Sequence, residues 1–406
     1  MHYCNAELDD RSLLELSPLF DSSWYLARYP DVSASGMSPI VHYLKFGADE
    51  HRNPSAHFDT AWYVTTYPEA RTARINPLIF HLRVGAAKGW LPGPAATLRL
   101  KTELPDAKIL ERFSELGMPT SATKFLRFGC QEFRSGSFNN AAREFKRAAQ
   151  ISPWQTDLFA LYKLALYKIN AEPIALFHEK FRDANVLVVH VSCTSRIAHA
   201  ITSCNTFHDC CAEVSNIVVV GDSALEEDCY KFDTEQNVLR VPASDSYEAL
   251  PIKVCKMLRF LGFTDLSLPV LKVDDDIHCS SLTTFKEHAR GALRALDYAG
   301  QIFSSPSRFL DCRHWHFGKC SDQEQNFKPD GLLFLDSYVA GSYYWLSSHA
   351  VTLASKISII NERWFEVELF EDRALGIALS TFGIRPEHWN GIQEGALKEA
   401  ATTAPR

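Results

Sequence analysis

The stretch LPVLKVDDDIHC, residues 268–279, decides the fold. Its first half is apolar and strand-forming, which is typical of a buried strand. Asp274, Asp275 and Asp276 follow it directly. Adjacent carboxylates repel one another, and Mg²⁺ or Mn²⁺ would offset that repulsion because hard cations prefer carboxylate oxygens. The stretch therefore predicts a strand that ends at a divalent metal site, with a solvated acidic turn as the alternative.

Other apolar runs place this strand in an α/β sheet. NVLVVHVSC (185–193) and SNIVVVGDS (215–223) predict buried parallel strands with a helix between them. Residues 247–263 predict the next helix, which leads into the strand before the aspartates. Ligands of open α/β sheets bind in the crevice at the carboxyl ends of the strands. We therefore expect an α/β domain over residues 183–392, with the aspartates in its ligand crevice.

Composition and charge exclude several classes of protein. The chain has 406 residues and a net charge of −7, which argues against a nucleic-acid partner. No apolar run approaches the roughly 18 to 20 residues that cross a bilayer, and the N-terminal stretch lacks a basic-then-apolar signal. The eleven cysteines include no CxxC pair, which argues against a zinc site. We expect a cytoplasmic protein with reduced thiols; disulfides formed in a secretory compartment are the alternative.

An internal repeat occupies the N-terminal part of the chain. FDSSWYLARYPDV begins at Phe20, and FDTAWYVTTYPEA follows 38 residues later at Phe58. Each copy predicts a helix after an Asp cap, a Pro turn, and a second helix that ends at Gly. We expect two helical repeats over residues 16–95. Trp24 and Trp62 are expected to pack between the helices, with sugar binding as the alternative.

Residues 104–182 predict a second, helical domain. Part of it matches the spacing of one tetratricopeptide motif, in which small residues lie where two helices cross. This segment is interpreted as a structural spacer, with protein docking as the alternative. Residues 393–406 are expected to form a disordered tail. The matching residues are Phe125, Gly129, Gly136, Ala141, Phe145, Ala148 and Pro153.

Four motifs of the α/β region, taken in order, resemble those of the β-1,3-galactosyltransferase and Fringe-like family of inverting glycosyltransferases. The resemblance covers about half of the chain. The N-terminal repeat is similar to one in many bacterial polysaccharide-related glycosyltransferases. Arg373 stands where the family has Val, and FLDSYVAG lacks the family's Pro residues, so donor and acceptor preference are open. The motifs are SDSYEALPIK (244–253), LKVDDD (271–276), YVAGSYYWLS (338–347) and FEDRALG (370–376).

The resemblance implies a Rossmann-like GT-A fold and a metal-dependent reaction. Asp276 would be the principal metal ligand, joined by Asp274, while Asp274 or Asp275 would hold hydroxyls of the nucleotide sugar. Asp372 would be the base that deprotonates the acceptor hydroxyl as it attacks the anomeric carbon. The alternative is that Glu371 and Asp372 favour the dipole at a helix N-terminus, and both roles are compatible.

Further residues receive roles from the same resemblance. His388 is a candidate second metal ligand or a structural residue, and Arg196 would reach the donor's uridine or phosphate. Trp315, between His314 and His316, would line the acceptor site or belong to a structural hairpin. The remaining expected donor contacts are Lys272, Asp245 and Lys253, and the remaining expected substrate contacts are Tyr338, Gly341, Ser342 and Glu371.

The leading prediction is therefore an enzyme that uses a UDP-sugar donor, carrying galactose or N-acetylglucosamine. It would extend a glycan or lipid-linked glycan acceptor by a β-1,3 linkage in bacterial surface polysaccharide synthesis. The helical N-terminal region would bind protein partners or place the enzyme at the inner membrane. One alternative is a non-catalytic scaffold with a degenerate transferase domain, which the intact DDD and ED motifs argue against. A retaining or phosphotransfer enzyme on the same fold is the other.

Overall fold

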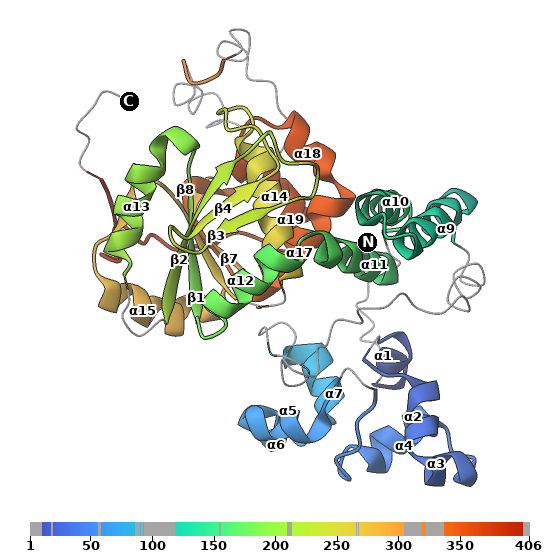
Figure 1. The fold of residues 1–406 in the computed structure, drawn as a ribbon. Coiled ribbons are helices and arrows are strands. Elements are labelled where there is room, and N and C mark those ends of the chain that lie inside the picture. The colour runs from blue at the N-terminus through green and yellow to red at the C-terminus, as the bar shows by residue number, and fades with distance from the viewer. Residues whose placement is uncertain are drawn as a thin grey trace, which may run out of the picture. The chain divides into compact units, whose positions relative to one another are not determined.

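The computed structural model divides into two compact units, Met1–Thr102 and Glu103–Arg406, which are described separately here (Figure 1). Among the described residues, no helix combines the length and apolar character needed to cross a membrane. The described cysteines are not joined in disulfides. The structure describes residues 10–17, 19–55, 58–85, 90, 92, 118–153, 156–208, 213–264, 266, 268–303, 318–321 and 337–400.

The first unit repeats its helices at the spacing of the sequence repeat. Each copy runs from a short helix through a Pro-initiated helix to a second Pro-initiated helix that continues into a π-helical turn. A further helix, α1 (Asp10–Leu16), precedes both copies. The first copy is α2 (Ser22–Arg28), α3 (Pro30–Ser35), α4 (Pro39–His42) and η1 (Tyr43–Gly47). The second is α5 (Thr60–Thr66), α6 (Pro68–Thr72), α7 (Pro77–Phe80) and η2 (His81–Gly85).

Tyrosines form the centre of each repeat. Tyr25 and Tyr63 are fully buried at equivalent positions. A Cβ atom at Gly47 or Gly85 would overlap the hydroxyl of the tyrosine in its own repeat, so only glycine fits there. Trp62 packs edge-on against a tyrosine of its repeat, with 5.7 Å between ring centroids, which agrees with the expected packing role.

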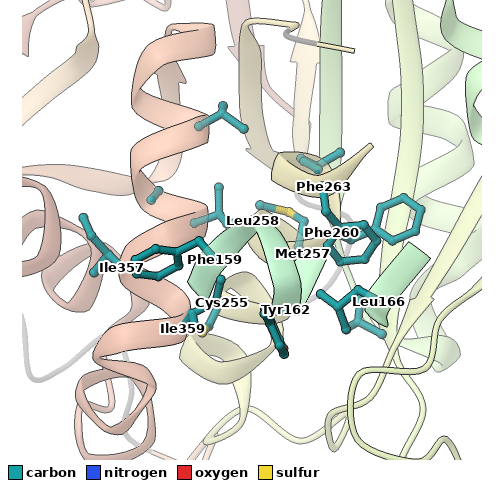
Figure 2. Close-up of a cluster of buried hydrophobic side chains, with 14 of the residues drawn as sticks. Phe159, Tyr162, Leu166, Cys255, Met257, Leu258, Phe260, Phe263, Ile357 and Ile359 are labelled. Atoms are coloured by element: carbon teal, nitrogen blue, oxygen red, sulfur yellow. The ribbon is translucent and has the colours of Figure 1, made fainter. Parts of the chain in front are cut away.

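In its described part, the second unit begins with helices that share a core with the α/β sheet. Phe159, Tyr162 and Leu166 of α11 lie among side chains of α14 and α17 (Figure 2). The prediction of a separate helical domain over residues 104–182 is therefore wrong for its described part. The physical reason is that one tetratricopeptide-like pair cannot bury its own apolar faces, and the sheet-covering helices bury them instead. The helices are α9 (Thr120–Arg134), α10 (Phe138–Ile151), α11 (Thr156–Ile169), α12 (Ala171–Phe181), α14 (Leu250–Phe263) and α17 (Ser348–Ile360).

A buried ionic cluster reinforces the same junction. The Arg259 guanidinium on α14 is fully buried and lies 2.7 Å from Asp228 Oδ1 and 3.1 Å from Glu362 Oε1. Tyr162 on α11 donates a hydrogen bond to Asp228 Oδ2 at 2.7 Å, and Lys146 on α10 pairs with Glu362. Buried charges are tolerated when each has a partner, so this cluster ties the helical segment to the sheet-bearing part of the unit.

One eight-stranded mixed sheet forms the centre of the second unit, in the order β3-β4-β2-β1-β5-β8-β7-β9. β2, β1 and β5 are parallel, as expected, and β4 joins them in the same direction, whereas β3 and β8 add antiparallel edges to that group. The strands are β1 (Val186–Val191), β2 (Val214–Gly221), β3 (Lys231–Asp233), β4 (Val238–Val241), β5 (Val270–Asp274), β7 (Tyr298–Phe303), β8 (Tyr338–Leu346) and β9 (Glu387–His388).

Helices cover both faces of the sheet (Figure 1). Leu187 and Val189 of β1 belong to the core that α14 and α17 complete, and Val186 and Val188 face the core that includes Phe285 of α15. Burial on both faces explains why the parallel strands are almost wholly apolar. The other elements are η3 (Thr194–Arg196), α13 (Ile197–Thr206), α15 (Leu282–Arg290), η4 (Ala292–Ala295), α18 (Glu362–Val367) and α19 (Glu371–Thr381).

The expected disordered tail is largely ordered. β10 (Leu397–Glu399) pairs antiparallel with β6 (Ile277–Cys279), the short strand after the aspartates. Ala396 is fully buried and Leu397 is 1% exposed, so these apolar side chains anchor the segment in the core. The prediction is wrong for residues 393–400, and residues 401–406 lie outside the described part of the chain.

Candidate active site

The aspartates lie where the sequence predicted them, at the carboxyl end of a central strand. Asp274 is the last residue of β5, and Asp275 and Asp276 form the turn into β6. β1 pairs with β5 so that Val191 lies opposite Asp274. Because these strands are parallel, the loop after β1 emerges beside the aspartates.

Asp275 holds that loop. One carboxylate oxygen accepts hydrogen bonds from Ser192 Oγ at 2.6 Å and Arg196 Nε at 2.8 Å, and the other accepts from Arg196 Nη2 at 2.6 Å. Burial favours the protonated acid, but the hydrogen bonds from Arg196 and Ser192 outweigh it and lower the pKa of Asp275. Three of the roughly four acceptor positions of the carboxylate are filled in this way, so Asp275 holds Arg196 in place.

Lys272 connects the aspartates to the region of the expected base. Its fully buried ammonium lies 2.6 Å from Asp274 Oδ1 and 2.7 Å from Glu371 Oε1, and it also donates to the carbonyl oxygen of Gly341. A lysine ammonium has three protons to donate, and these partners account for all of them. The expectation that Lys272 contacts the donor is therefore not supported, because its role here is to hold β5, β8 and α19 together.

Glu371 and Asp372 open helix α19. Asp372 accepts hydrogen bonds from the backbone N–H of Gly341 at 3.0 Å and of Arg373 at 2.8 Å. Glu371 is 4% exposed, and its Oε2 has no hydrogen-bond partner among the described residues. A Cβ atom at Gly341 would lie 3.1 Å from Glu371 Oε1, so glycine permits the strand to approach these carboxylates closely.

The electrostatics of this pair suit proton transfer. Burial raises the pKa of Asp372 to about 6, and the backbone hydrogen bond from Arg373 and the charge of Lys272 reduce the rise. Burial raises the pKa of Glu371 to about 7, opposed by Lys272 and supported by the Asp372 carboxylate. With a pKa of about 6, Asp372 would be a stronger base than a water-exposed aspartate and would still be largely ionised near neutral pH. The first-turn position also favours both negative charges through the helix dipole.

Asp245 and Lys253 form a second ion pair near the aspartates. Asp245 Oδ1 lies 2.7 Å from Lys253 Nζ and accepts from the Gly221 N–H at 2.8 Å, and Asp245 also accepts from the Thr194 N–H. Lys253 donates to the Ser192 carbonyl at 2.8 Å. These contacts join the loops after β1, β2 and β4. Both residues were expected to contact the donor, and the contacts that the structure shows for them are with these segments of the chain.

Asp276 differs from its neighbours because its carboxylate has no hydrogen bond or ion pair with another described residue. It lines a cavity of about 510 Å³ at the turn between β5 and β6. Arg196 also lines this cavity. The other lining residues are His199, Thr202, Asp275, His278, Lys398, Glu399 and Ala400.

The predicted three-residue metal site is not assembled. Within the part of the chain that the structure describes, no group of three or more His, Cys, Asp or Glu side chains could hold a metal ion. His388 is exposed on β9, which pairs with β7, and Asp274 is held by Lys272. The free carboxylate of Asp276 instead fits a cation that takes most of its ligands from substrate phosphates and water, as Mg²⁺ commonly does.

The remaining predicted residues fall into two groups. Tyr338 and Ser342 are half-buried on β8, the strand that brings Gly341 to Asp372. Trp315 lies outside the described residues.

Two residues near the site, Ser192 and Lys398, were not predicted from the sequence. Ser192 directly follows the apolar strand β1, and this position was the signal that could have revealed it as a site residue. Lys398 lies in a segment whose sequence shows no strand pattern.

Comparison with known proteins agrees with this geometry. Residues 204–390 match a family model described as Galactosyltransferase. No curated protein matches the chain. The mixed sheet with helices on both faces fits an α/β fold of the GT-A type. The matched segment contains the aspartate turn, Lys272, Gly341 and the Glu371–Asp372 pair. Residues 204–390 therefore form a galactosyltransferase-family domain, and the chain is a glycosyltransferase of the hexosyltransferase kind.

Proposed function

We propose that the chain is an inverting glycosyltransferase that moves galactose or N-acetylglucosamine from a UDP-sugar to a glycan acceptor, with Asp372 as the catalytic base. The observation that carries the proposal is the placement of Asp372. It is a carboxylate fixed by the Gly341 N–H at 3.0 Å, with a pKa raised to about 6. Lys272 links its helix to the aspartate turn, where the donor would bind.

The reaction uses these residues in one displacement. A carboxylate oxygen of Asp372 takes the proton of the acceptor hydroxyl while the acceptor oxygen bonds to the anomeric carbon. The bond from that carbon to the diphosphate breaks, and the nucleoside diphosphate leaves with the electron pair. Each carboxylate oxygen can accept more than one hydrogen bond, so the backbone contacts of Asp372 leave room for the acceptor hydroxyl.

A metal ion fits the same proposal. Asp276 would hold Mn²⁺ or Mg²⁺ together with the donor phosphates, and the bound cation would neutralise charge on the departing diphosphate. The support is the carboxylate of Asp276, which is the member of the triplet that other described residues leave unpaired. Asp274 and Asp275 are held by Lys272 and Arg196 and would shape the site around the ligand.

The proposals for the acceptor and for the linkage are based on the family resemblance. We propose a β-1,3 linkage on a glycan or lipid-linked glycan, within bacterial surface polysaccharide synthesis. In that setting the enzyme would act in the cytoplasm, at the inner membrane surface, and its N-terminal repeats would bind a protein partner of the assembly.

A donor screen tests the proposal. Purified full-length chain is incubated with Mn²⁺ and common UDP-sugars, and UDP release is measured; NMR of the product then reads the anomeric configuration. We expect turnover with at least one donor and inversion at the anomeric carbon. Asp372→Asn should abolish turnover and still bind UDP, whereas Asp183→Asn, at a side chain that is 82% exposed, should behave as wild type. Absence of both UDP binding and turnover would favour the scaffold, and a retained anomer would exclude the inverting mechanism.

A further inference from the structure

The last described strand lies beside the aspartate turn although it falls outside the family match. The match ends at residue 390, and β10 spans Leu397–Glu399. Lys398 pairs in register with His278 of β6. The Ala400 N–H donates to the carbonyl oxygen of Asp276 at 2.7 Å. β10 therefore fixes the backbone of the residue that we propose as the metal ligand.

β10 also supplies one wall of the cavity at Asp276. Further lining residues come from α13 and the residue before it, namely His199, Thr202 and Arg196. A cavity of about 510 Å³ lies within the usual size range of small-molecule sites, which is roughly 300 to 1,000 Å³. The ordered C-terminal segment is thus part of the cavity and does not merely cover the core.

The charges in this cavity are incompletely matched. The Lys398 ammonium is exposed and, like the Asp276 carboxylate, makes no hydrogen bond or ion pair with another described residue. The two groups line one cavity without forming an ion pair with each other. A ligand that carries both a cation and an anion would satisfy both, because the cation would pair with Asp276 and the anion with Lys398. A metal-bound diphosphate has that composition.

We propose that Lys398 is a donor-binding residue that contacts the β-phosphate of the nucleotide sugar, so that β10 completes a donor site begun by Arg196 and Asp276. This inference rests on the proposed function. It assigns to the segment beyond the family match a direct part in holding the leaving group. It also predicts that donor affinity depends on one charge near the C-terminal end of the described chain.

Calorimetric titration with UDP and with UMP, both in Mn²⁺, tests the inference. Full-length wild type is compared with Lys398→Ala, Lys398→Arg and Lys398→Glu. A hydrogen bond to a charged group contributes enough for Lys398→Ala to weaken UDP binding about tenfold. UMP binding should stay unchanged because UMP lacks the β-phosphate. The Arg variant should retain most of the UDP affinity, and the Glu variant should lose more than the Ala variant.

Lys231→Ala is the matched control, because Lys231 is an exposed lysine on β3, which is also a three-residue strand and lies at one edge of the eight-stranded sheet. It should bind UDP as wild type does. Unchanged UDP affinity in Lys398→Ala would overturn the inference. So would an equal loss for UDP and UMP that Arg does not restore, because it would indicate a structural role. If wild type itself binds neither nucleotide, the proposed function fails and this inference fails with it.

Discussion

Lys272 on β5 and Glu371 on α19 lie 99 residues apart in the sequence, and their side chains meet in the interior at 2.7 Å. Through Asp274, Lys272 also reaches the aspartate turn at 2.6 Å. The buried ammonium therefore joins the aspartate turn, which is the proposed donor side of the site, to the helix that carries Asp372. Its loss should affect both sides at once.

Lys272→Met should destabilise the protein by about 3–5 kcal/mol, because it leaves Glu371 as a buried carboxylate without its counter-charge. The methionine side chain is similar in length to that of lysine, so the change in the free energy of unfolding comes from the lost charge and not from a new cavity. Equilibrium unfolding in urea measures it, with Lys231→Met as the exposed control. A loss of stability no greater than that of the control would show that Lys272 is not the link between the two sides.

The rate should depend on pH through Asp372. The base must be ionised to accept a proton, so kcat/KM should fall as the pH drops through about 6 and level off above it. Asp372→Glu should keep measurable activity with a displaced midpoint, and Asp372→Asn should have none. Initial rates between pH 5 and pH 8, at saturating Mn²⁺, provide the profile. A flat profile across that range would assign the base to another residue.

Glu371 should make stability depend on pH in the opposite direction to a salt-bridged surface acid. Its pKa rises from 4.5 to about 7 on folding. A raised pKa contributes stability that is complete below the unfolded value and is lost as the pH rises through the folded value. The stability of wild type relative to Glu371→Gln should therefore fall by about 3 kcal/mol between pH 4.5 and pH 8. Urea unfolding in metal-free buffer measures the difference, and a constant difference would contradict it.

Removing the helical segment should unfold the catalytic part of the chain. A chain that begins at residue 183 lacks α11, whose Phe159 and Leu166 pack within the shared core, and it lacks the Tyr162 partner of Asp228. Arg259→Met tests the same junction by substitution, and it should cost about 3–5 kcal/mol because Asp228 loses its buried counter-charge. Arg182→Ala, at a side chain that is 71% exposed, is the control. If a chain that begins at residue 183 is soluble and folds cooperatively, the helical segment and the α/β part are separate domains after all.

The Asp276 carboxylate should determine how much Mn²⁺ is needed for UDP binding. Asp276→Asn removes the free carboxylate and should raise the Mn²⁺ concentration needed for half-maximal UDP binding by about tenfold or more, because one charged ligand is lost. Titration of Mn²⁺ at fixed UDP provides the readout, with Asp183→Asn as the control. If Asp276→Asn leaves the metal dependence unchanged, the cation does not bind through this residue.

Part of this architecture was predictable because its signals are local. The apolar runs that became β1, β2 and β5 identified the parallel centre, and the position of the aspartates after β5 identified the crevice. The pairing of Lys272 with Glu371 was not predictable from either residue alone, because no local pattern links positions in a strand and a distant helix. The segment with Lys398 was missed because a three-residue strand has no periodicity to detect.

The prediction of a separate helical domain over residues 104–182 was wrong for a different reason. The sequence shows where one supersecondary unit resembles a tetratricopeptide pair, but it does not show what covers the outer face of that pair. Here α11 and α17 pack against α10 and share one core with α14, and Tyr162 and Lys146 extend the contact into a buried ionic cluster. A repeat motif with a single copy therefore indicates helix geometry more securely than it indicates an independent domain.

The ordered end of the described chain has a practical consequence. Ala400 lines the cavity at Asp276, so a bulky group attached at this residue would stand at the edge of the proposed donor site. An affinity label or fluorescent protein fused there would crowd incoming nucleotides and distort measured affinities. Immobilising the enzyme through a group at this residue would do the same.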